Sequence, residues 1–403
     1  MERAENLSLE AALDRLLRAA ADTAVGSREL VATDRALGRV TAEEIRVVRN
    51  LPPFDNSAMD GFALRHGEAG RRLRIAATIY AGDHPRAILE PGECYRIMTG
   101  AKVPEDADAV VPIEACSDVT ETAVTVPGRI APESNLRRRG EEVAAGEVLI
   151  AAGTVLEAGH IALLGSQGIM SVAVRSRLRI AVLSTGNELR EPWEQADEEE
   201  VHNANAFGIL SLLRQYGYEA EYHGRIPDDR EATERVIAGL KRYDAIITSG
   251  GISMGAADHL YASLLANGME ALFHGVRLKP GHPVTMGVMD GTLVMALPGN
   301  PLATLLTLLV LGIPALRARQ GSARPRHFEA LARMGTSLKF RGKRSELVLG
   351  RLEEGVFHPT MHYRYGSGMI TPLTQSDAVA VVPEGTTVLE EGALLGVIPL
   401  SRG

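Results

Sequence analysis

Apolar residues at the start of the chain recur at the spacing of a helix. They follow one another at intervals of one to four residues: Leu9, Leu13, Leu16, Leu17 and Ala20. This pattern predicts an amphipathic helix, and Ser8 can cap its start. Residues 28–48 predict a second helix, or a helix with a turn at Gly38, leading into a strand. The two prolines within residues 50–53 lack amide donors and interrupt regular structure.

From about residue 54 to 145, short β-rich runs alternate with Gly, Pro and Asp turns. The runs are LRIAATIY, ECYRIMTG, DAVVPIE and AVTVPGR. They predict a small, mostly β domain over residues 49–144. Residues 145–177 return to short strands and a helix over residues 160–165. We expect residues 1–48 and 145–177 to form one N-terminal helical and linker domain, into which the β domain is inserted.

Residues 178–322 alternate buried strands with helices. LRIAVLST, YDAIITS and TLVMALP are continuous apolar segments, and another strand is expected near residues 271–278. One helix places Phe207, Leu210, Leu213 and Tyr216 on one side and can end at Gly217. Asp228 can cap the next helix. Continuous apolar strands that alternate with helices predict a doubly wound parallel sheet covered on both faces.

Short strands and turns return in residues 323–403. The runs are FEALARM, SELVLGRLE, GVFHPTM, DAVAVVPEG and LLGVIPL. They predict a small C-terminal β-barrel. The fold class is therefore a multidomain α+β and α/β protein with four packed parts.

Composition narrows the class of protein. The 403 residues are 45% hydrophobic and 23% charged, with a net charge of −8. These values are typical of a globular protein and argue against a nucleic-acid or acidic-membrane partner. The basic cluster over residues 137–139 is either a solvated turn or an anion contact. Cys94 and Cys116 are too few and too widely spaced for a zinc site or a disulfide framework, so we expect buried free thiols.

The segment 302–313 is the longest apolar stretch, and it is too short and too broken to predict a membrane span. The first residues carry acids throughout and contain no continuous apolar run. We therefore expect a cytoplasmic location.

Three loops rich in Gly and hydroxyl residues follow strands of the doubly wound sheet. They are residues 184–188, 248–255 and 297–301. Carboxyl ends of parallel strands meet at one edge, where such sheets bind ligands. Glycines let the backbone approach an anion, and helix starts favour negative charge. Each loop alone could be a tight turn, but three together predict a phosphate site.

Acids gather near the same edge: Glu188, Asp228, Asp229 and Asp258. Magnesium prefers few carboxylates together with phosphate oxygens and water, so these acids predict a divalent metal site. Asp228 could also be a helix cap, and Asp258 a first-turn acid. Lys279 could face an anion or could be an exposed loop lysine.

At this point the motifs support a resemblance. PPFDNSAMDGFA, RIMTGAKVPEDADAVVPIE, STGNEL, TSGGISMGAADH, KPGHPVTMG and LPGNP follow one another over residues 7–403. This ordered series resembles that of the molybdopterin molybdenumtransferases, to which the gephyrin E domain is related.

The resemblance implies four domains, the first interrupted by the second, in a homodimer whose active-site cleft both protomers build. The third domain would resemble the pterin adenylyltransferase domain. The substrates would be adenylylated molybdopterin and molybdate, and the products the molybdenum cofactor and AMP, with Mg²⁺ as cofactor. Other proteins of molybdenum cofactor biosynthesis are candidate partners.

The resemblance also assigns residues. The candidate catalytic residues are Asp60, Thr99, Glu142, Glu188, Asp228, Asp258 and Lys279, and the candidate metal ligands among them are Glu188, Asp228 and Asp258. The candidate substrate-binding residues are Thr185, Gly186, Ser249, Gly250, Gly251, Ser253, Pro298, Gly299, Asn300, Pro301, Arg344 and Ser367.

Three positions depart from the family pattern. Gly275 and His282 stand where lysines are common, and Ala256 stands where an acid is common. Two positive charges are thus replaced near a proposed anion site. A neutral histidine attracts molybdate more weakly than lysine, and its charge depends on pH.

Two other functions are open from the residues. A scaffold or binding protein, as the gephyrin E domain also is, would not need the acids at 60, 188, 228 and 258. An adenylyltransferase would need only the third part of the chain and would consume ATP. The order of motifs over the whole chain favours the molybdenumtransferase.

Overall fold

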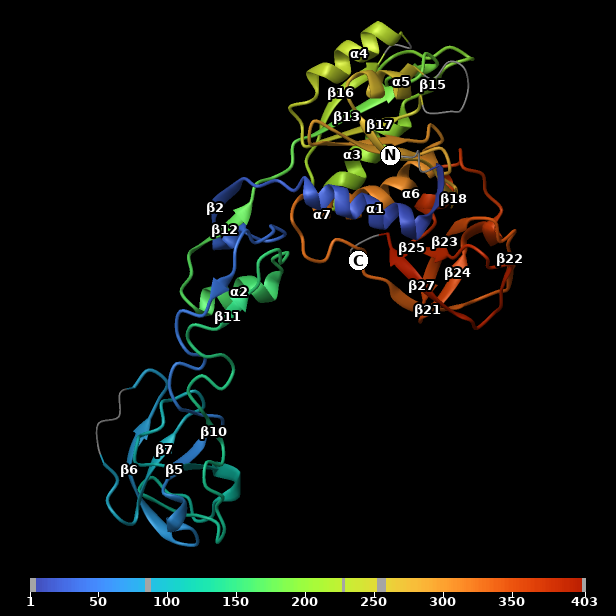
Figure 1. Ribbon diagram of the computed structural model, residues 1–403. Helices are drawn as coiled ribbons and strands as arrows, with labels where there is room; N and C mark the ends of the chain where they lie inside the picture. The colour runs from blue at the N-terminus through green and yellow to red at the C-terminus, as the bar shows by residue number, and fades with distance from the viewer. Residues whose placement is uncertain (1–4, 84–87, 227–228, 252–258, 401–403) are drawn as a thin grey trace. The chain divides into compact units, whose positions relative to one another are not determined.

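The computed structural model describes residues 5–83, 88–226, 229–251 and 259–400 (Figure 1). The chain divides into two compact units. The first comprises Met1–Ala42, Ala152–Ala158 and Ser171–Gly403, and the second comprises Glu43–Ala151 and Gly159–Met170. Our division into four domains stays a prediction.

The predicted N-terminal helix is α1, Leu9–Asp22, and its cap is confirmed. The Ser8 side chain accepts a hydrogen bond from the Ala11 amide at 3.2 Å. The buried positions Ala12, Leu16 and Ala20 lie at helical spacing and join the main apolar core. Strand β1, Glu5–Ser8, leads into this helix.

The predicted second helix over residues 28–48 is wrong. Arg28–Ala32 is strand β2, which pairs antiparallel with β12, Ser171–Arg175. A short 3₁₀ turn follows at Thr33–Arg35. RELVA has fair helix propensity, but pairing with a segment some 140 residues away outweighs it, and local pattern cannot reveal such a partner.

The second unit is β-rich, as predicted (Figure 1). Its five-stranded sheet has the order β8-β5-β7-β6-β9. The strands are β5 Gly61–Leu64, β6 Arg72–Ile79, β7 Glu93–Ile97, β8 Ala109–Pro112 and β9 Ala123–Thr125. Short pairs flank it: β4 Asn56–Ser57 with β10 Leu136–Arg137, and β3 Ile45–Arg46 with β11 Val148–Ile150. The expected helix near residue 160 is α2, Ala158–Ser166.

Four parallel strands form the centre of the α/β part of the first unit, in the order β16-β13-β17-β20. They are β16 Glu221–Ile226, β13 Ile180–Thr185, β17 Ala245–Ser249 and β20 Thr292–Leu297. The side chains of successive residues of β13 pack in two different apolar clusters. Val182 belongs to the first cluster and Leu183 to the second. The sheet is therefore covered on both faces, as its continuous apolar strands predicted.

The helices of this part are α3 Ala204–Gln215, α4 Arg230–Gly239, α5 His259–Ala266, α6 Pro301–Thr307 and α7 Ile313–Arg319. Two details differ from the prediction. Phe207 is 47% exposed, and Ile209 is buried in its place. Asp229 caps α4 by accepting from the Ala232 amide at 2.7 Å, whereas Asp228 lies outside the described residues.

The sequence pattern did not predict β16 or an antiparallel strand in this sheet. Strand β19, Thr285–Met289, runs antiparallel to β20 and to β18, Glu270–Lys279. A short parallel pair, β14 Leu189–Arg190 with β15 Val201–His202, lies between β13 and α3 in the sequence.

The apolar run after β20 is longer than expected. A continuous helical stretch covers residues 301–319, with a π-helical turn at Leu308–Gly312 between α6 and α7. Its length and composition would suffice to cross a membrane, but 83% of its most apolar window is buried inside the molecule. It is a core helix.

The C-terminal part is a closed five-stranded barrel, as predicted. Its strands pair in the ring β23-β24-β21-β27-β25, and β25 returns to β23. They are β21 Ala330–Met334, β23 Ser345–Glu353, β24 Val356–Pro359, β25 Ala378–Val382 and β27 Leu394–Pro399. The short pair β22 Leu338–Lys339 with β26 Val388–Leu389, a 3₁₀ turn at Thr360–Tyr363 and α8 Thr371–Thr374 complete it.

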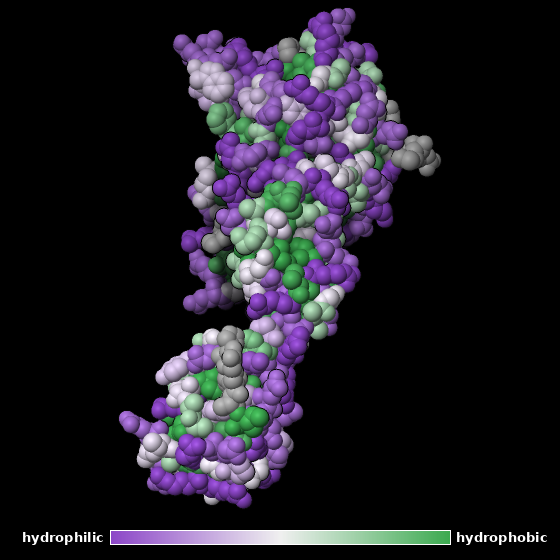
Figure 2. Space-filling view, turned by 90° about the vertical axis from the view of Figure 1, so that its left-hand side faces the viewer, coloured by the Kyte–Doolittle hydropathy of each residue, from purple (hydrophilic) through white to green (hydrophobic). Residues whose placement is uncertain are grey.

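Strand β18 joins the barrel to the α/β sheet. It pairs with β19 along most of its length, with β1 in parallel, and with β23 through Leu278 and Lys279. On the face seen in Figure 2, hydrophilic residues predominate and apolar residues form separate patches.

Candidate active site

The described residues of the three Gly-rich loops meet at the carboxyl edge of the parallel strands, as predicted. They line one cavity of about 900 Å³. Ten predicted residues lie in its wall: Thr185, Gly186, Glu188, Ser249, Gly250, Gly251, Pro298, Gly299, Asn300 and Pro301. Ser253, Asp228 and Asp258 lie outside the described residues.

Close backbone approach explains the paired glycines after β17. A side-chain carbon at Gly250 would lie 2.5 Å from the Thr185 carbonyl oxygen, and one at Gly251 would lie 2.6 Å from Thr185 Oγ1. Both residues also have positive φ, 84° and 65°. The two loops touch because these positions carry no side chain, which leaves a smooth backbone wall for a ligand.

Two asparagines of this cavity were missed from the sequence. Asn203 caps α3, accepts from the Ala206 amide at 3.2 Å, and donates to the Tyr222 hydroxyl at 2.8 Å. Asn205 donates to the Gly299 carbonyl at 2.7 Å, while its own Oδ1 is buried without a hydrogen-bond partner among the described residues. An Asn ahead of an amphipathic segment signals a helix start, so HNANAF could have indicated Asn203.

A second cavity of about 280 Å³ lies next to the first, and Pro283, Pro298 and Asn300 line both. It contains the predicted Lys279, Arg344 and Ser367. Asn300 donates to Ser367 Oγ at 2.8 Å, which connects the LPGNP loop to the barrel. Arg344 is exposed and has no ion pair among the described residues. Cations from two parts of the chain thus meet in one small space.

Glu346, which sequence reasoning missed, holds Lys279. Its carboxylate is buried and accepts from Lys279 Nζ at 2.8 Å and from the Tyr363 hydroxyl. The Lys279 ammonium also lies 4.9 Å from the centre of the Tyr363 ring. Burial alone would raise the pKa of Glu346, but the bonds from Lys279 and Tyr363 lower it below its ordinary value. Lys279 is therefore a paired, oriented cation.

In the second unit, Asp60 and Thr99 come together from separate motifs. Asp60 Oδ1 accepts from the Thr99 amide and from the Thr99 hydroxyl, each at 2.7 Å. These two bonds lower the pKa of Asp60, the hydroxyl bond most. The carboxylate is exposed and stays ionised at neutral pH.

Glu142 makes an ion pair with Arg137 at 3.7 Å. Of the basic cluster, Arg137 also bonds Glu141, and Arg138 bonds Asp55 and Glu133. Arg139 donates its amide to Asp55. Carboxylates thus occupy most of this cluster, which favours the structural interpretation over an anion contact.

The thiols are free, as predicted. Cys94 is buried, and burial raises its pKa to about 12, whereas Cys116 is half-buried. Neither thiol is activated for nucleophilic chemistry.

Three family models match successive parts of the chain: "MoeA N-terminal region (domain I and II)" over residues 7–168, "Probable molybdopterin binding domain" over 181–318, and "MoeA C-terminal region (domain IV)" over 331–400. The molybdopterin molybdenumtransferase of Haemophilus influenzae is 35% identical over 312 residues, which cover 76% of this chain and 77% of that protein. The chain belongs to the molybdopterin molybdenumtransferase family.

The similarity extends over nearly the full length of other members of the family. The molybdopterin molybdenumtransferase of a Nostoc species is 30% identical over 92% of this chain and 88% of its own. A crystal structure of the molybdopterin biosynthesis MoeA protein from Pyrococcus horikoshii is 27% identical, with a TM-score of 0.75 over 99% of this chain and 100% of that one. The resemblance and the fold class inferred from the motifs are confirmed.

Of the two departures that lie among the described residues, His282 lines the smaller cavity. Its Nδ1 lies 2.9 Å from the Val276 carbonyl, which fixes Nδ1 as the protonated nitrogen. Gly275 does not line the cavity and has φ of 83°, a conformation that a lysine would adopt with strain. The loss of charge at the proposed anion site therefore concerns His282. Ala256 lies outside the described residues.

The described residues include one of the three candidate metal ligands. Glu188 is exposed at the larger cavity, and its carboxylate lies against the backbone of Gly186. No cluster of three or more potential ligands occurs among the described residues, and the other two candidates lie outside them. One free carboxylate beside an anion-binding loop fits Mg²⁺, which takes its remaining ligands from phosphate and water.

Proposed function

We propose that this protein inserts molybdate into adenylylated molybdopterin and releases AMP, as an enzyme of molybdenum cofactor biosynthesis. Membership of the molybdenumtransferase family supports the reaction class. The main support for the proposal is that two cavities with different linings lie next to each other. A Gly-walled cavity of about 900 Å³ shares Pro283, Pro298 and Asn300 with a cationic cavity of about 280 Å³.

The larger cavity suits the nucleotide part of the substrate. The loop backbones at Gly186, Gly250 and Gly251 would face the phosphates, and Thr185 would add a hydroxyl. The unpartnered Asn205 oxygen would accept a hydrogen bond from an N–H group of the ligand, because a buried acceptor gains most from such a bond.

The smaller cavity suits molybdate as a substrate. Arg344 presents a guanidinium fork, Ser367 a hydroxyl and Lys279 a fixed ammonium. Since Glu346 already balances Lys279, Arg344 supplies most of the uncompensated charge. A molybdate oxygen would attack the phosphoanhydride, or water would do so once metal transfer begins. Attack by molybdate would form a Mo–O–P bond at the pterin-side phosphorus, which water would later hydrolyse, and attack by water would leave the pterin monophosphate. In either case the P–O bond to the adenylyl group breaks and AMP leaves.

Mg²⁺ would be held by Glu188 together with Asp228 and Asp258. When bound, it would neutralise charge that develops on phosphate.

Asp60 would position a reactant from the second unit rather than serve as a strong base. A general base works best with a pKa near the working pH, and the Thr99 bonds shift the pKa of Asp60 the other way. Thr99 would fix the carboxylate, and Glu142 would hold the segment that carries Arg137. We also propose a cytoplasmic homodimer, with other proteins of cofactor biosynthesis as partners.

The test is AMP release from adenylylated molybdopterin with magnesium present, as molybdate is titrated. Saturable release, together with a product that activates an apo-molybdoenzyme, is expected. Consumption of ATP in place of adenylylated pterin would instead identify an adenylyltransferase. Tight nucleotide binding with no release at any molybdate concentration would identify a binding protein and overturn the proposal.

A further inference from the structure

A third cavity lies at the opposite edge of the parallel sheet, where the strands begin. Its wall consists of residues that immediately precede β13, β17 and β20, together with the ends of α1 and α7. The cavity has a volume of about 360 Å³ and shares no lining residue with the two cavities at the carboxyl edge. This cavity is therefore separate from the site of the proposed reaction.

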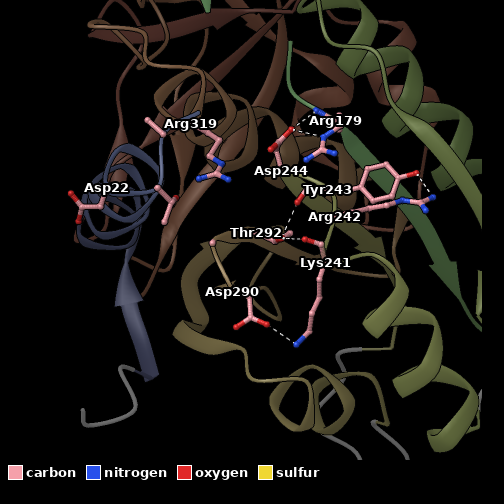
Figure 3. Close-up of a pocket in the computed structure, with 12 residues that line it drawn as sticks. Asp22, Arg179, Lys241, Arg242, Tyr243, Asp244, Asp290, Thr292 and Arg319 are labelled. Carbon is pink, nitrogen blue, oxygen red and sulfur yellow. Dashed lines mark hydrogen bonds and ion pairs between the residues drawn. The ribbon is translucent and has the colours of Figure 1, made fainter. Parts of the chain in front are cut away.

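Arg319, the last residue of α7, is the distinctive group in this cavity. It is only 7% exposed, and its Nε has no hydrogen-bond partner among the described residues. No carboxylate of the described chain lies within ion-pair distance of it. Figure 3 shows its guanidinium directed into the cavity. Asp244 attracts Arg319 electrostatically but lies beyond ion-pair distance. A buried charge with no direct ion pair is costly, so an anion bound here would stabilise the folded chain.

Two of the other cations of the cavity are already paired with aspartates. Arg179 pairs with Asp244 at 3.4 Å, and Lys241 pairs with Asp290 at 2.7 Å. Figure 3 shows the Asp22 carboxylate directed away from Arg319. The lining contains four cations, Arg179, Lys241, Arg242 and Arg319, and three aspartates, which leaves one positive charge in excess. Arg179 is well exposed and keeps further N–H groups for a ligand.

The lining also restricts the size and class of the ligand. Tyr243 is buried, and Arg242 covers its ring at 5.3 Å, so no open aromatic face is available for a base or a pterin. The wall is otherwise almost entirely polar. Two guanidinium groups match the oxygens of a tetrahedral oxyanion, which each can hold by two parallel hydrogen bonds.

We propose that the cavity at the amino edge of the sheet is a second anion site, which binds a small tetrahedral oxyanion of the phosphate class through Arg319 and Arg179. Phosphate and molybdate share this shape and charge, and either could occupy the site in the cell.

Calorimetric titration of the full chain with inorganic phosphate tests the site. Arg319→Gln removes the buried charge, and Ala24→Glu places a carboxylate in the cavity while Arg319 remains. Arg235→Gln, on the exposed face of α4, is the matched control. Arg344→Gln identifies heat that arises at the carboxyl edge.

Wild type, Arg235→Gln and Arg344→Gln should bind phosphate with similar affinity at this site, and Arg319→Gln should weaken binding roughly tenfold or more. Phosphate should raise the melting temperature of wild type but not of Arg319→Gln. If Arg319→Gln fails to fold, loss of binding in Ala24→Glu supports the site, and binding retained there contradicts it.

A parallel titration with molybdate distinguishes the two ligands, since the tighter Arg319-dependent ligand is the occupant. Phosphate and molybdate binding that both persist in Arg319→Gln would overturn the proposal. So would the lack of any Arg319-dependent binding of either anion at concentrations on the order of 10 mM.

Discussion

Lys279 and Glu346 face each other in register where β18 meets β23, and the ammonium donates to the carboxylate at 2.8 Å. The lysine comes from the α/β sheet and the glutamate from the barrel. Their side chains are 56% and 5% exposed, so the anion is the buried partner. Loss of the cation should therefore affect stability as well as the smaller cavity, where we propose that molybdate binds.

We expect Lys279→Met to lower the free energy of unfolding by about 1–3 kcal/mol near neutral pH, because the buried Glu346 loses its cation and keeps the Tyr363 hydroxyl and the Arg341 backbone as partners. The folded pKa of Glu346 is depressed, so the pair stabilises the protein above the ordinary pKa of 4.5, and this stabilisation is lost as pH falls through the folded value. Urea unfolding at several pH values measures the effect. The double variant Lys279→Met/Glu346→Gln should recover much of the loss; an equal loss in both would contradict the pairing argument.

His282→Lys should tighten molybdate binding about tenfold. The new lysine adds a permanent positive charge to the smaller cavity, whose natural lysine, Lys279, is already paired with Glu346. Half-saturating molybdate for AMP release, measured between pH 6 and 8, reports the change. His66→Lys in the second unit is the control, and an equal gain there would mean a general charge effect.

Asp60→Asn should lower turnover by about 100-fold while nucleotide binding is kept. An amide cannot provide the charge that Thr99 fixes in place. Thr99→Val, which removes one of the two bonds, should cause a smaller loss. Asp118→Asn is a matched control, since Asp118 also accepts from a threonine hydroxyl in the same unit. Unchanged turnover in Asp60→Asn would remove Asp60 from the mechanism.

Gly250→Ala should destabilise the chain by about 1–3 kcal/mol and weaken nucleotide binding, because the new carbon would meet the Thr185 carbonyl at 2.5 Å. Gly239→Ala, on α4 with open space around it, should be neutral or stabilising. Thermal unfolding and nucleotide titration compare the two. Equal behaviour of both variants would show that the loops can separate without cost.

The sequence predicted the elements whose own residues determine their conformation. Ser8, the apolar stripe of α1 and the continuous apolar strands β13, β17 and β20 each specify their own structure. β2 was missed because its conformation depends on a distant partner strand. β19 was missed because TMGVM is too short to show a period.

The same division holds for the site. Each Gly-rich loop directly follows a parallel strand. Because the carboxyl ends of such strands lie at one edge of the sheet, the sequence predicted that the loops meet. Glu346 lies within the apolar alternation of SELVLG and reads as an ordinary strand residue; only tertiary packing places it against Lys279. Asp229, and not Asp228, caps α4 because the helix begins one residue later than its apolar pattern indicates.

Strand β18 pairs with β19 of the sheet and with β23 of the barrel through one uninterrupted backbone. This pairing places Lys279 opposite Glu346 across one strand spacing, and Arg344 directly precedes β23. In the proposed reaction, molybdate in the smaller cavity would lie between side chains whose backbone positions depend on this strand pairing. Discrimination among oxyanions by size would then be a property of β-sheet geometry, and a substitution deep in the barrel could alter it without touching the ligand.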